Sequence, residues 1–204
     1  KVFGRARAHL PFFVLSLHDM GWRGVGRGGG RMLLLGVDAM APGVGSAPLF
    51  REDWGLTGVA PPVWDVTPAA HPADSTSVRL AFLTPTTLTH KGKALRTPTP
   101  QTFTSRLAAR LELMSFFHEG ISVDWDFRRL DRLARDVRVR SHHTETEQFQ
   151  RVSRRSGRVP MKGFVGVMEC EDVHPDLLAL WRTAEHIHVG KQAAFGFGRV
   201  VVET

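Results

Sequence analysis

The order of strands and helices predicted after residue 77 is the feature that most limits the fold of this chain. Residues 77–88 alternate apolar side chains at Val78, Leu80 and Phe82, as in a half-buried strand. Residues 102–120 place apolar side chains at helical spacing. After these we expect a short helix at 124–137, strands at 137–152 and 163–170, a helix at 174–186 and a last strand at 198–203. This order is the split βαβ, or ferredoxin-like, pattern, so we predict an α+β fold of ferredoxin-like (RRM-like) topology.

The first forty residues show part of the same pattern. Leu10, Phe13, Val14 and Leu17 lie on one helical face, and Gly21 supplies a stop. Strands are expected before and after this helix, over 1–8 and 31–40, which matches the second half of a ferredoxin-like unit.

Residues 41–76 are rich in proline, glycine and small polar residues, which is typical of a linker or a long irregular connection. We therefore predict three parts: the end of a first ferredoxin-like domain at 1–40, a linker at 41–76, and a second ferredoxin-like domain at 77–204. The chain begins at Lys1, inside a predicted strand, so we expect the first domain to be incomplete here.

The charge balance favours a polyanionic partner. The chain has 27 Lys and Arg against 20 Asp and Glu, a formal net charge of +7. Such a surplus most often serves nucleic acid and less often a membrane surface, and solvated arginines without a partner are the alternative. No apolar run approaches the ~20 residues that span a bilayer, so no membrane partner is expected. Cys170 is the only cysteine and can form no internal disulfide, which indicates a reducing cytoplasm.

Two common ligand classes are not expected. Residues 24–29 satisfy the dinucleotide fingerprint G-x-G-x-x-G, but this loop follows a helix and leads into a strand, the reverse of the required context. No phosphate-binding G-x-x-x-x-G-K-[ST] occurs, so we predict no nucleotide cofactor. His142 and His143 point to opposite faces of a strand, and His186 and His188 lack a third ligand at a recognisable spacing. We therefore predict no metal.

Three basic segments contain the candidate binding residues. Cations beside accessible aromatic rings and backbone N–H groups suit single-stranded RNA, because cations and amides meet phosphates while rings stack on unpaired bases. The alternatives are core packing for Phe197 and a tight turn of positive φ for the glycines. We expect the last two segments to share one basic surface. The candidates are Lys91 and Lys93; Arg151, Ser153, Arg154, Arg155 and Lys162; and His188, Gly190, Lys191, Phe195, Gly196 and Gly198.

Four stretches resemble the CRISPR-associated RAMP-type endoribonucleases that process precursor crRNA. They are VRLAFLTPTTLTHKGK (78–93), RRSGRVPMKGFVG (154–166), HVGKQAAFGFGRVVV (188–202), which is the most specific, and FGRARAHLPFFVLSLHDMGWRGVGRGGG (3–30). The resemblance implies tandem ferredoxin-like domains that cradle a CRISPR repeat RNA in a prokaryotic cytoplasm, with the crRNA and a CRISPR effector complex as partners. It further implies metal-independent cleavage, in which the ribose 2′-hydroxyl attacks the adjacent phosphate and leaves a 2′,3′-cyclic phosphate.

The resemblance does not supply a catalytic residue. The acid/base histidine of the family lies upstream of the segment that Lys1 matches, and no spacing selects among His18, His90, His142 and His188 as a substitute. Where the family has the motif SRQ, this chain has Ser153-Arg154-Arg155, and where the family has GG, it has Lys162-Gly163. These two differences concern which RNA the protein recognises. Two other functions therefore stay open, a non-catalytic RAMP subunit that retains its RNA and a general RNA-binding module.

Overall fold

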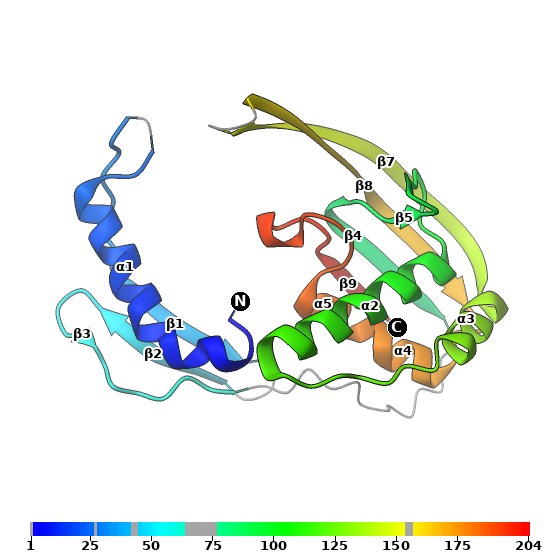
Figure 1. Ribbon diagram of the computed structural model, residues 1–204, viewed down its shortest axis with the longest axis horizontal. Helices are drawn as coiled ribbons and strands as arrows, with labels where there is room; N and C mark the ends of the chain where they lie inside the picture. Colours follow the sequence, from blue (N-terminus) through cyan, green and yellow to red (C-terminus); the bar gives the residue numbers. More distant parts are fainter. Residues whose placement is uncertain (1, 27, 42–44, 64–76, 154–156) are drawn as a thin grey trace. The chain divides into compact units, whose positions relative to one another are not determined.

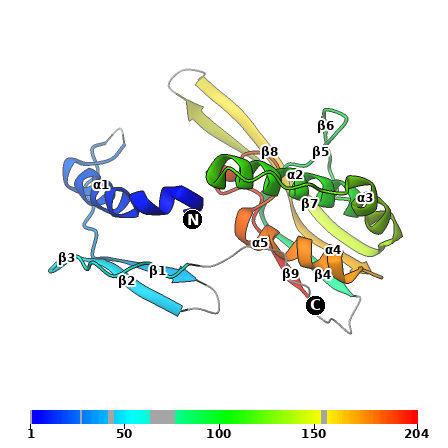
Figure 2. The ribbon, with the colours of Figure 1, turned by 60° about the horizontal axis from the view of Figure 1, so that its bottom comes forward.

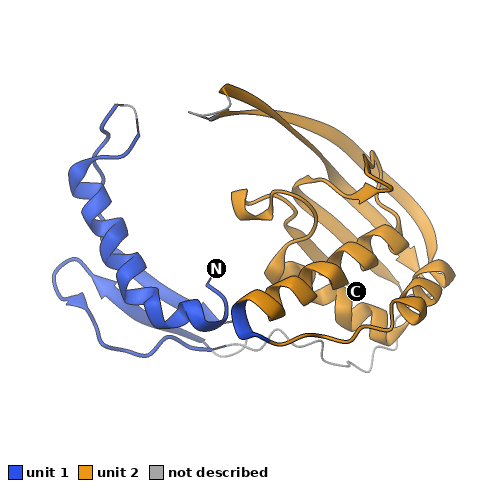
Figure 3. Cartoon of the chain, viewed as in Figure 1, with its two compact units in different colours: residues 1–65, 118–120 blue, residues 66–117, 121–204 orange. Residues whose placement is uncertain are grey.

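The chain forms two compact units, shown in different colours in Figure 3. The computed structural model describes residues 2–26, 28–41, 45–63, 77–153 and 157–204. Unit 1 contains residues 1–65 and 118–120, and unit 2 contains residues 66–117 and 121–204. No helix in these described ranges is long and apolar enough to cross a membrane.

Unit 1 consists of two consecutive helices and a three-stranded antiparallel sheet. A 3-10 helix, η1 (Gly4–His9), leads into α1 (Leu10–Arg23), and the sheet has the order β1 (Gly36–Ala41), β2 (Gly45–Arg51) and β3 (Gly55–Leu56). The helix predicted near residue 10 is confirmed. The strand predicted over 1–8 is wrong, since the stretch RARAH after Gly4 alternates only small alanines with charged arginines, buries none of its residues, and consists largely of Arg and Ala, which favour helical turns.

Glycine positions explain where α1 ends. The predicted stop at Gly21 is wrong, because the helix continues to Arg23 and is capped by Gly24 at φ +90°. Gly21 instead allows a close approach of the following chain. Its carbonyl accepts a hydrogen bond from the N–H of Met32 at 3.2 Å, and a Cβ there would collide with the Met32 carbonyl oxygen.

The irregular connection predicted over 41–76 contains strands. β2 and β3 lie inside it, so the prediction of irregular structure is wrong for 45–51 and 55–56; residues 64–76 lie outside the described residues. β2 forms because Leu49 and Phe50 are buried, at 8% and 3% exposure. Pro48 is tolerated beside a bulge, where the register against β1 shifts between Val37 and Asp38.

Unit 2 has the ferredoxin-like topology that the sequence predicts. Its main elements are β4 (Val78–Thr86), α2 (Pro100–Glu119), α3 (Phe127–Asp136), β7 (Arg138–Ser153), β8 (Gly157–Glu171), α4 (Pro175–Arg182), α5 (Ala184–Ile187) and β9 (Val200–Glu203). The four strands form an antiparallel sheet of order β7-β8-β4-β9. This order places the two middle strands of the split βαβ pattern side by side at one edge.

The helices of unit 2 cover one face of this sheet (Figures 1 and 2), and aromatic side chains pack them against it. The ring of Phe82 on β4 lies edge-on to Phe103 of α2 at 5.9 Å and to Phe164 of β8 at 5.0 Å. Phe103 in turn meets Trp181 of α4 at 5.5 Å, and the Trp181 indole N–H donates to the hydroxyl of Thr104 at 2.9 Å. The core therefore fixes β4, the strand whose far end carries the candidate site.

Strands β7 and β8 extend well beyond the rest of the sheet (Figure 1). β4 pairs with β8 only from Cys170 to Phe164, whereas β7 and β8 remain paired as far as Ser153 and Gly157. We call the two-stranded extension, residues 147–153 and 157–163, the arm. The sequence predicts the second of these strands only over 163–170, but β8 already begins at Gly157, because its backbone continues to pair with β7 beyond the end of β4.

Candidate nucleic-acid interface

The glycine-rich loop, residues 188–199, is closed at its base by backbone hydrogen bonds to itself and to β4. The Val189 N–H donates to the Gly198 carbonyl at 2.9 Å, and the Gly198 N–H donates to the Pro85 carbonyl at 3.1 Å. Gly198 has φ +74°, and a Cβ there would collide with the Val189 carbonyl oxygen. Glycine is therefore required at 198 both for its backbone conformation and for the close approach of Val189.

The first turn of the loop is held by Thr87, which follows β4. The Lys191 N–H donates to the Thr87 carbonyl at 3.1 Å. Gly190 has φ +83°, and a Cβ there would lie 2.5 Å from the same carbonyl oxygen. This contact leaves the Lys191 side chain exposed while its backbone is fixed.

The far side of the loop is held by the hydroxyl of Thr84. This hydroxyl donates to the Gly196 carbonyl and accepts a hydrogen bond from the Arg199 N–H, both at 2.9 Å. Gly196 has φ +87° but would place a Cβ in open space. Glycine at 196 is therefore favoured by backbone conformation alone.

Arg110 and His188 stabilise the start of the loop through contacts with backbone carbonyls. Arg110 of α2 donates from Nε to the Ile187 carbonyl at 2.7 Å, at the end of α5, and burial lowers the pKa of Arg110. His188 adopts a positive φ of +62°, and its Nδ1 lies 3.0 Å from the Phe197 carbonyl oxygen. His188 thus contributes to the shape of the loop as well as to its surface.

The tip of the loop contacts the arm. The guanidinium carbon of Arg151 on β7 lies 4.5 Å from the ring centroid of Phe195 in η2 (Ala193–Phe195), and the rings of Phe149 and Phe197 are 5.9 Å apart. η2 and the end of the arm lie on the same side of unit 2 in Figure 1. Phe195 remains 55% exposed. Cations and accessible aromatic rings from two distant segments therefore share one surface, which we call the loop–arm surface.

Lys162 is linked to the base of the loop through its backbone, while its side chain lies on the other face of the arm from Phe149 and Arg151, because Lys162 pairs with Gln148. It lies on β8 within the arm, opposite Gln148, and its side chain is exposed. Its carbonyl accepts a hydrogen bond from the Thr87 hydroxyl at 2.5 Å. The backbones of Lys162 and Lys191 are therefore both bonded to one threonine.

The remaining candidates have different positions. Lys91 and Lys93 belong to the hairpin of β5 (Thr89–His90) and β6 (Lys93–Ala94), whose turn has φ +47° at Lys91 and +78° at Gly92, as a type I′ turn requires. In the described part of the chain, neither lysine makes a hydrogen bond, ion pair or ring contact with the glycine-rich loop. Ser153 is the last residue of β7, and Arg154 and Arg155 lie outside the described residues.

Sequence reasoning missed Thr84, Thr87 and Phe149. Both threonines lie in the stretch LTPTT at the end of β4, and the partners of their hydroxyls are 75 to 115 residues away in the chain, so no local pattern reveals them. Phe149 alternates with Arg151 along β7, and this spacing was a usable signal, because residues two apart on a strand share a face.

The four histidines considered as acid/base candidates are dispersed over the structure. His18 lies on α1 in unit 1, where its Nε2 accepts a hydrogen bond from the Trp22 indole at 3.2 Å. His90 lies on β5 and His142 on β7, and of the four only His188 belongs to the glycine-rich loop. Within the described ranges, no three His, Cys, Asp or Glu side chains form a group that could hold a metal ion.

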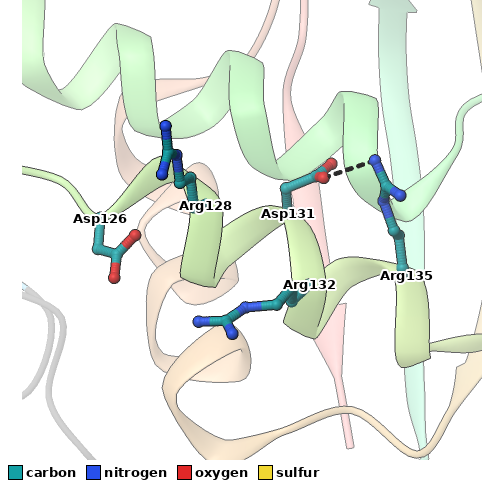
Figure 4. A pocket seen from close by; sticks show the side chains of 5 residues that line it. All are labelled: Asp126, Arg128, Asp131, Arg132 and Arg135. Atoms are coloured by element: carbon teal, nitrogen blue, oxygen red, sulfur yellow. Dashed lines mark ion pairs between the residues drawn. The ribbon is translucent and has the colours of Figure 1, made fainter.

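A second basic cluster lies on α3, away from the loop–arm surface. Figure 4 shows the pocket that it lines, with side chains of both signs. Arg135 pairs with Asp131 at 2.8 Å, and the Asp126 carboxylate caps the helix by accepting the Arg129 N–H at 2.8 Å. This mixture of charges is typical of a solvated helix face, and we do not include it in the candidate site.

Comparison with solved structures shows similarity to Cas6 proteins. A Cas6 product complex is 14% identical with a TM-score of 0.51 over 69% of this chain and 56% of that one, and this likeness shows the fold alone. A second Cas6 product complex is 24% identical with a TM-score of 0.48 over 65% and 54% of the two chains. Thermus thermophilus Cas6 is 17% identical with a TM-score of 0.46 over 64% and 55%. The chain thus spans about half the length of the structures that it matches.

Comparison with curated protein sequences gives no match. Residues 80–200, however, match the family described as CRISPR-associated endoribonuclease Cas6. The matched region is more than half of the chain, and it contains most of the ferredoxin-like sheet, the arm and the whole glycine-rich loop. With this match and the topology of unit 2, we conclude that the chain belongs to the CRISPR-associated endoribonuclease Cas6 family.

Proposed function

We propose that this protein binds CRISPR repeat RNA on the loop–arm surface and cleaves it to produce crRNA. Membership of the Cas6 endoribonuclease family supports the reaction class. The crRNA and, through it, a CRISPR effector complex are the proposed partners. The net charge of +7 agrees with a polyanionic ligand.

The contact between the loop and the arm is the observation that carries this proposal. Arg151 and Phe195 stack at 4.5 Å, which places a cation and an exposed ring together, and Lys191 adds an exposed ammonium group on the loop. Phosphates of an unpaired RNA strand suit the cations, and a base suits the accessible ring.

The proposed cleavage needs no metal ion. The 2′-oxygen forms a bond to the adjacent phosphorus while the bond from phosphorus to the 5′-oxygen breaks. A general base takes the 2′-hydroxyl proton, a general acid gives a proton to the 5′-oxygen, and a cation stabilises the charge on the phosphorane. The products are a 2′,3′-cyclic phosphate and a free 5′-hydroxyl. Lys162 and Lys191 are proposed to hold the strand, and we assign no residue as acid or base.

The test is incubation of the protein with repeat RNA in the presence of a chelator. We expect cleavage of the all-ribose repeat and none of an RNA with a single 2′-deoxyribose at the cleavage position. Tight binding of both RNAs without product would indicate a non-catalytic subunit that retains its RNA. Equal binding of repeat and unrelated RNA would indicate a general RNA-binding module.

Charge reversal tests the location of the RNA. Lys191→Glu should weaken binding and flatten its dependence on salt, since each phosphate contact on a single strand contributes about 0.7 to the slope of log K against log salt. Arg132→Glu on α3 makes the same change in net charge outside the site and is the matched control. Equal losses for the two variants would contradict the proposed location.

A further inference from the structure

We propose that Thr87 is a positioning residue that sets the separation between two RNA-binding lysines, Lys162 and Lys191. This inference rests on the proposed function, because it assumes that both ammonium groups bind phosphates of one strand that passes over the free edge of β8 in the arm. Thr87 itself touches no substrate in this proposal. It acts by holding the backbone of each lysine.

Thr87 bonds to both lysines through different atoms. Its hydroxyl donates to the Lys162 carbonyl at 2.5 Å, and its carbonyl accepts from the Lys191 N–H at 3.1 Å. Lys162 belongs to the arm and Lys191 to the glycine-rich loop. Thr87 is therefore the residue at which these two basic segments are bonded to a common point of the fold.

Each lysine adjoins a glycine that permits this close approach. Gly163 follows Lys162, and a Cβ there would lie 2.6 Å from the Thr86 nitrogen. Gly190 precedes Lys191, and a Cβ there would lie 2.5 Å from the Thr87 carbonyl oxygen. The arm and the loop are thus packed against the same short stretch of backbone, one through Lys162-Gly163 and the other through Gly190-Lys191.

The stretch between them has little freedom to move. Pro85 has a fixed φ, and its carbonyl accepts the Gly198 N–H at 3.1 Å. Thr86 is fully buried, with its hydroxyl bonded to the Thr84 carbonyl at 2.9 Å. Leu88 is also fully buried. Thr87 is therefore held from both sides, so the separation that it imposes on the lysines is set before RNA arrives.

A fixed separation makes the two lysine–phosphate contacts cooperative. Once one phosphate is bound, the next phosphate of the strand is already near the second ammonium group, so the second contact forms without further ordering of the protein. Without the Thr87 hydroxyl, the arm can shift relative to the loop and this advantage falls. The effect appears in RNA binding more than in folding, because Thr87→Val keeps the shape of the side chain.

The experiment compares Thr87→Val with Thr87→Ser, which keeps the hydroxyl. We expect Thr87→Val to bind repeat RNA about fivefold more weakly, the effect of one hydrogen bond of about 1 kcal/mol, and with a smaller salt slope. Thr87→Ser should remain within about twofold of the unchanged protein. Thr57→Val is the control, because Thr57 in unit 1 also donates its hydroxyl to a carbonyl, that of Pro48 at 2.6 Å.

A double-mutant cycle separates positioning from a general loss of stability. In the unchanged protein, Lys162→Ala and Lys191→Ala should be non-additive, since loss of one contact makes the other less effective. In the Thr87→Val background, the same two substitutions should become additive. A melting temperature measured for every variant identifies any that fail to fold, and Thr87→Ser then supplies the comparison.

The outcomes distinguish this inference from the proposed function. If neither lysine variant weakens binding, the proposed function fails. If both lysine variants weaken binding but Thr87→Val leaves affinity and non-additivity unchanged, the positioning role alone is wrong. If Thr57→Val weakens binding as much as Thr87→Val, loss of a threonine hydroxyl acts through stability and the positioning role is again wrong.

Discussion

Alanine at Gly198 should destabilise unit 2 far more than alanine at Gly196, although both glycines have similar backbone conformations. Their φ angles are +74° and +87°, so each substitution carries the left-handed cost of roughly 1–2 kcal/mol. At Gly196 the new Cβ would enter open space. We therefore expect Gly196→Ala to lower the free energy of unfolding by roughly 1–2 kcal/mol and no more.

Gly198→Ala has two further costs. Its Cβ would collide with the Val189 carbonyl oxygen, and forcing an extra methyl group into packed structure costs roughly 1–3 kcal/mol. The displacement also weakens the 2.9 Å hydrogen bond from the Val189 N–H to the Gly198 carbonyl, at a cost of about 1 kcal/mol. The total is roughly 3–6 kcal/mol, a large part of the stability of an ordinary domain.

Urea denaturation of the two variants measures this difference. The midpoint should fall much further for Gly198→Ala, with an unchanged dependence of the unfolding free energy on urea concentration if the unfolded state is unaffected. Gly190→Ala should resemble Gly198→Ala, because its Cβ would lie 2.5 Å from the Thr87 carbonyl oxygen. Equal destabilisation by Gly196→Ala and Gly198→Ala would refute this reasoning, because it would show that the contact between Gly198 and the Val189 carbonyl does not stabilise the loop.

Three further predictions follow from single contacts. A double-mutant cycle with Arg151→Ala and Phe195→Leu should give a coupling of about 0.5–1 kcal/mol in urea unfolding; no coupling would mean that the stacked pair is not formed in solution. Arg110→Met should lower the unfolding free energy by about 1–3 kcal/mol, because the Ile187 carbonyl loses a charged donor; an unchanged midpoint would contradict this. Burial raises the pKa of the Cys170 thiol from 9.0 to about 12, so its contribution to stability is complete below pH 9.0 and declines as the pH rises toward 12, when the unfolded chain loses the proton first. The free energy of unfolding should fall by at most about 1.4 kcal/mol per pH unit. Urea unfolding between about pH 8 and pH 10 measures this fall, and Cys170→Ala should lack it. An equal fall in both proteins would show that another group titrates.

Local patterns predicted the ferredoxin-like unit because each of its strands and helices is indicated by residues close together in the chain. The alternation from Val78 to Phe82 and the helical spacing from Phe103 to Met114 each reflect one face turned toward the core. Local patterns gave the wrong prediction for residues 45–51, where Gly45 and Pro48 suggest a loop. There a bulge beside Pro48 and the burial of Phe50 allow a strand, and both depend on pairing with β1.

The candidate site was less visible to local patterns. The sequence pointed to Arg151, Lys191 and Phe195 by residue type, and the structure brings Arg151 and Phe195 into contact at 4.5 Å. Among the described residues, Lys91 makes no such contact, because it lies in the β5–β6 hairpin, a separate turn after the end of β4. Thr87 carried no signal, since its importance lies in two hydrogen bonds to residues far along the chain.

By itself, the sequence determined the topology of unit 2, the surplus of positive charge and the glycines that permit a left-handed backbone. These properties depend on residues close together in the chain and on side-chain chemistry. Only the tertiary structure decided that the arm reaches the glycine-rich loop and that the end of β4 holds both. The physical reason is that these contacts join groups far apart in the chain, from 44 residues for Arg151 and Phe195 to 115 residues for Thr84 and Arg199, and such pairs are selected by the packing of the whole unit.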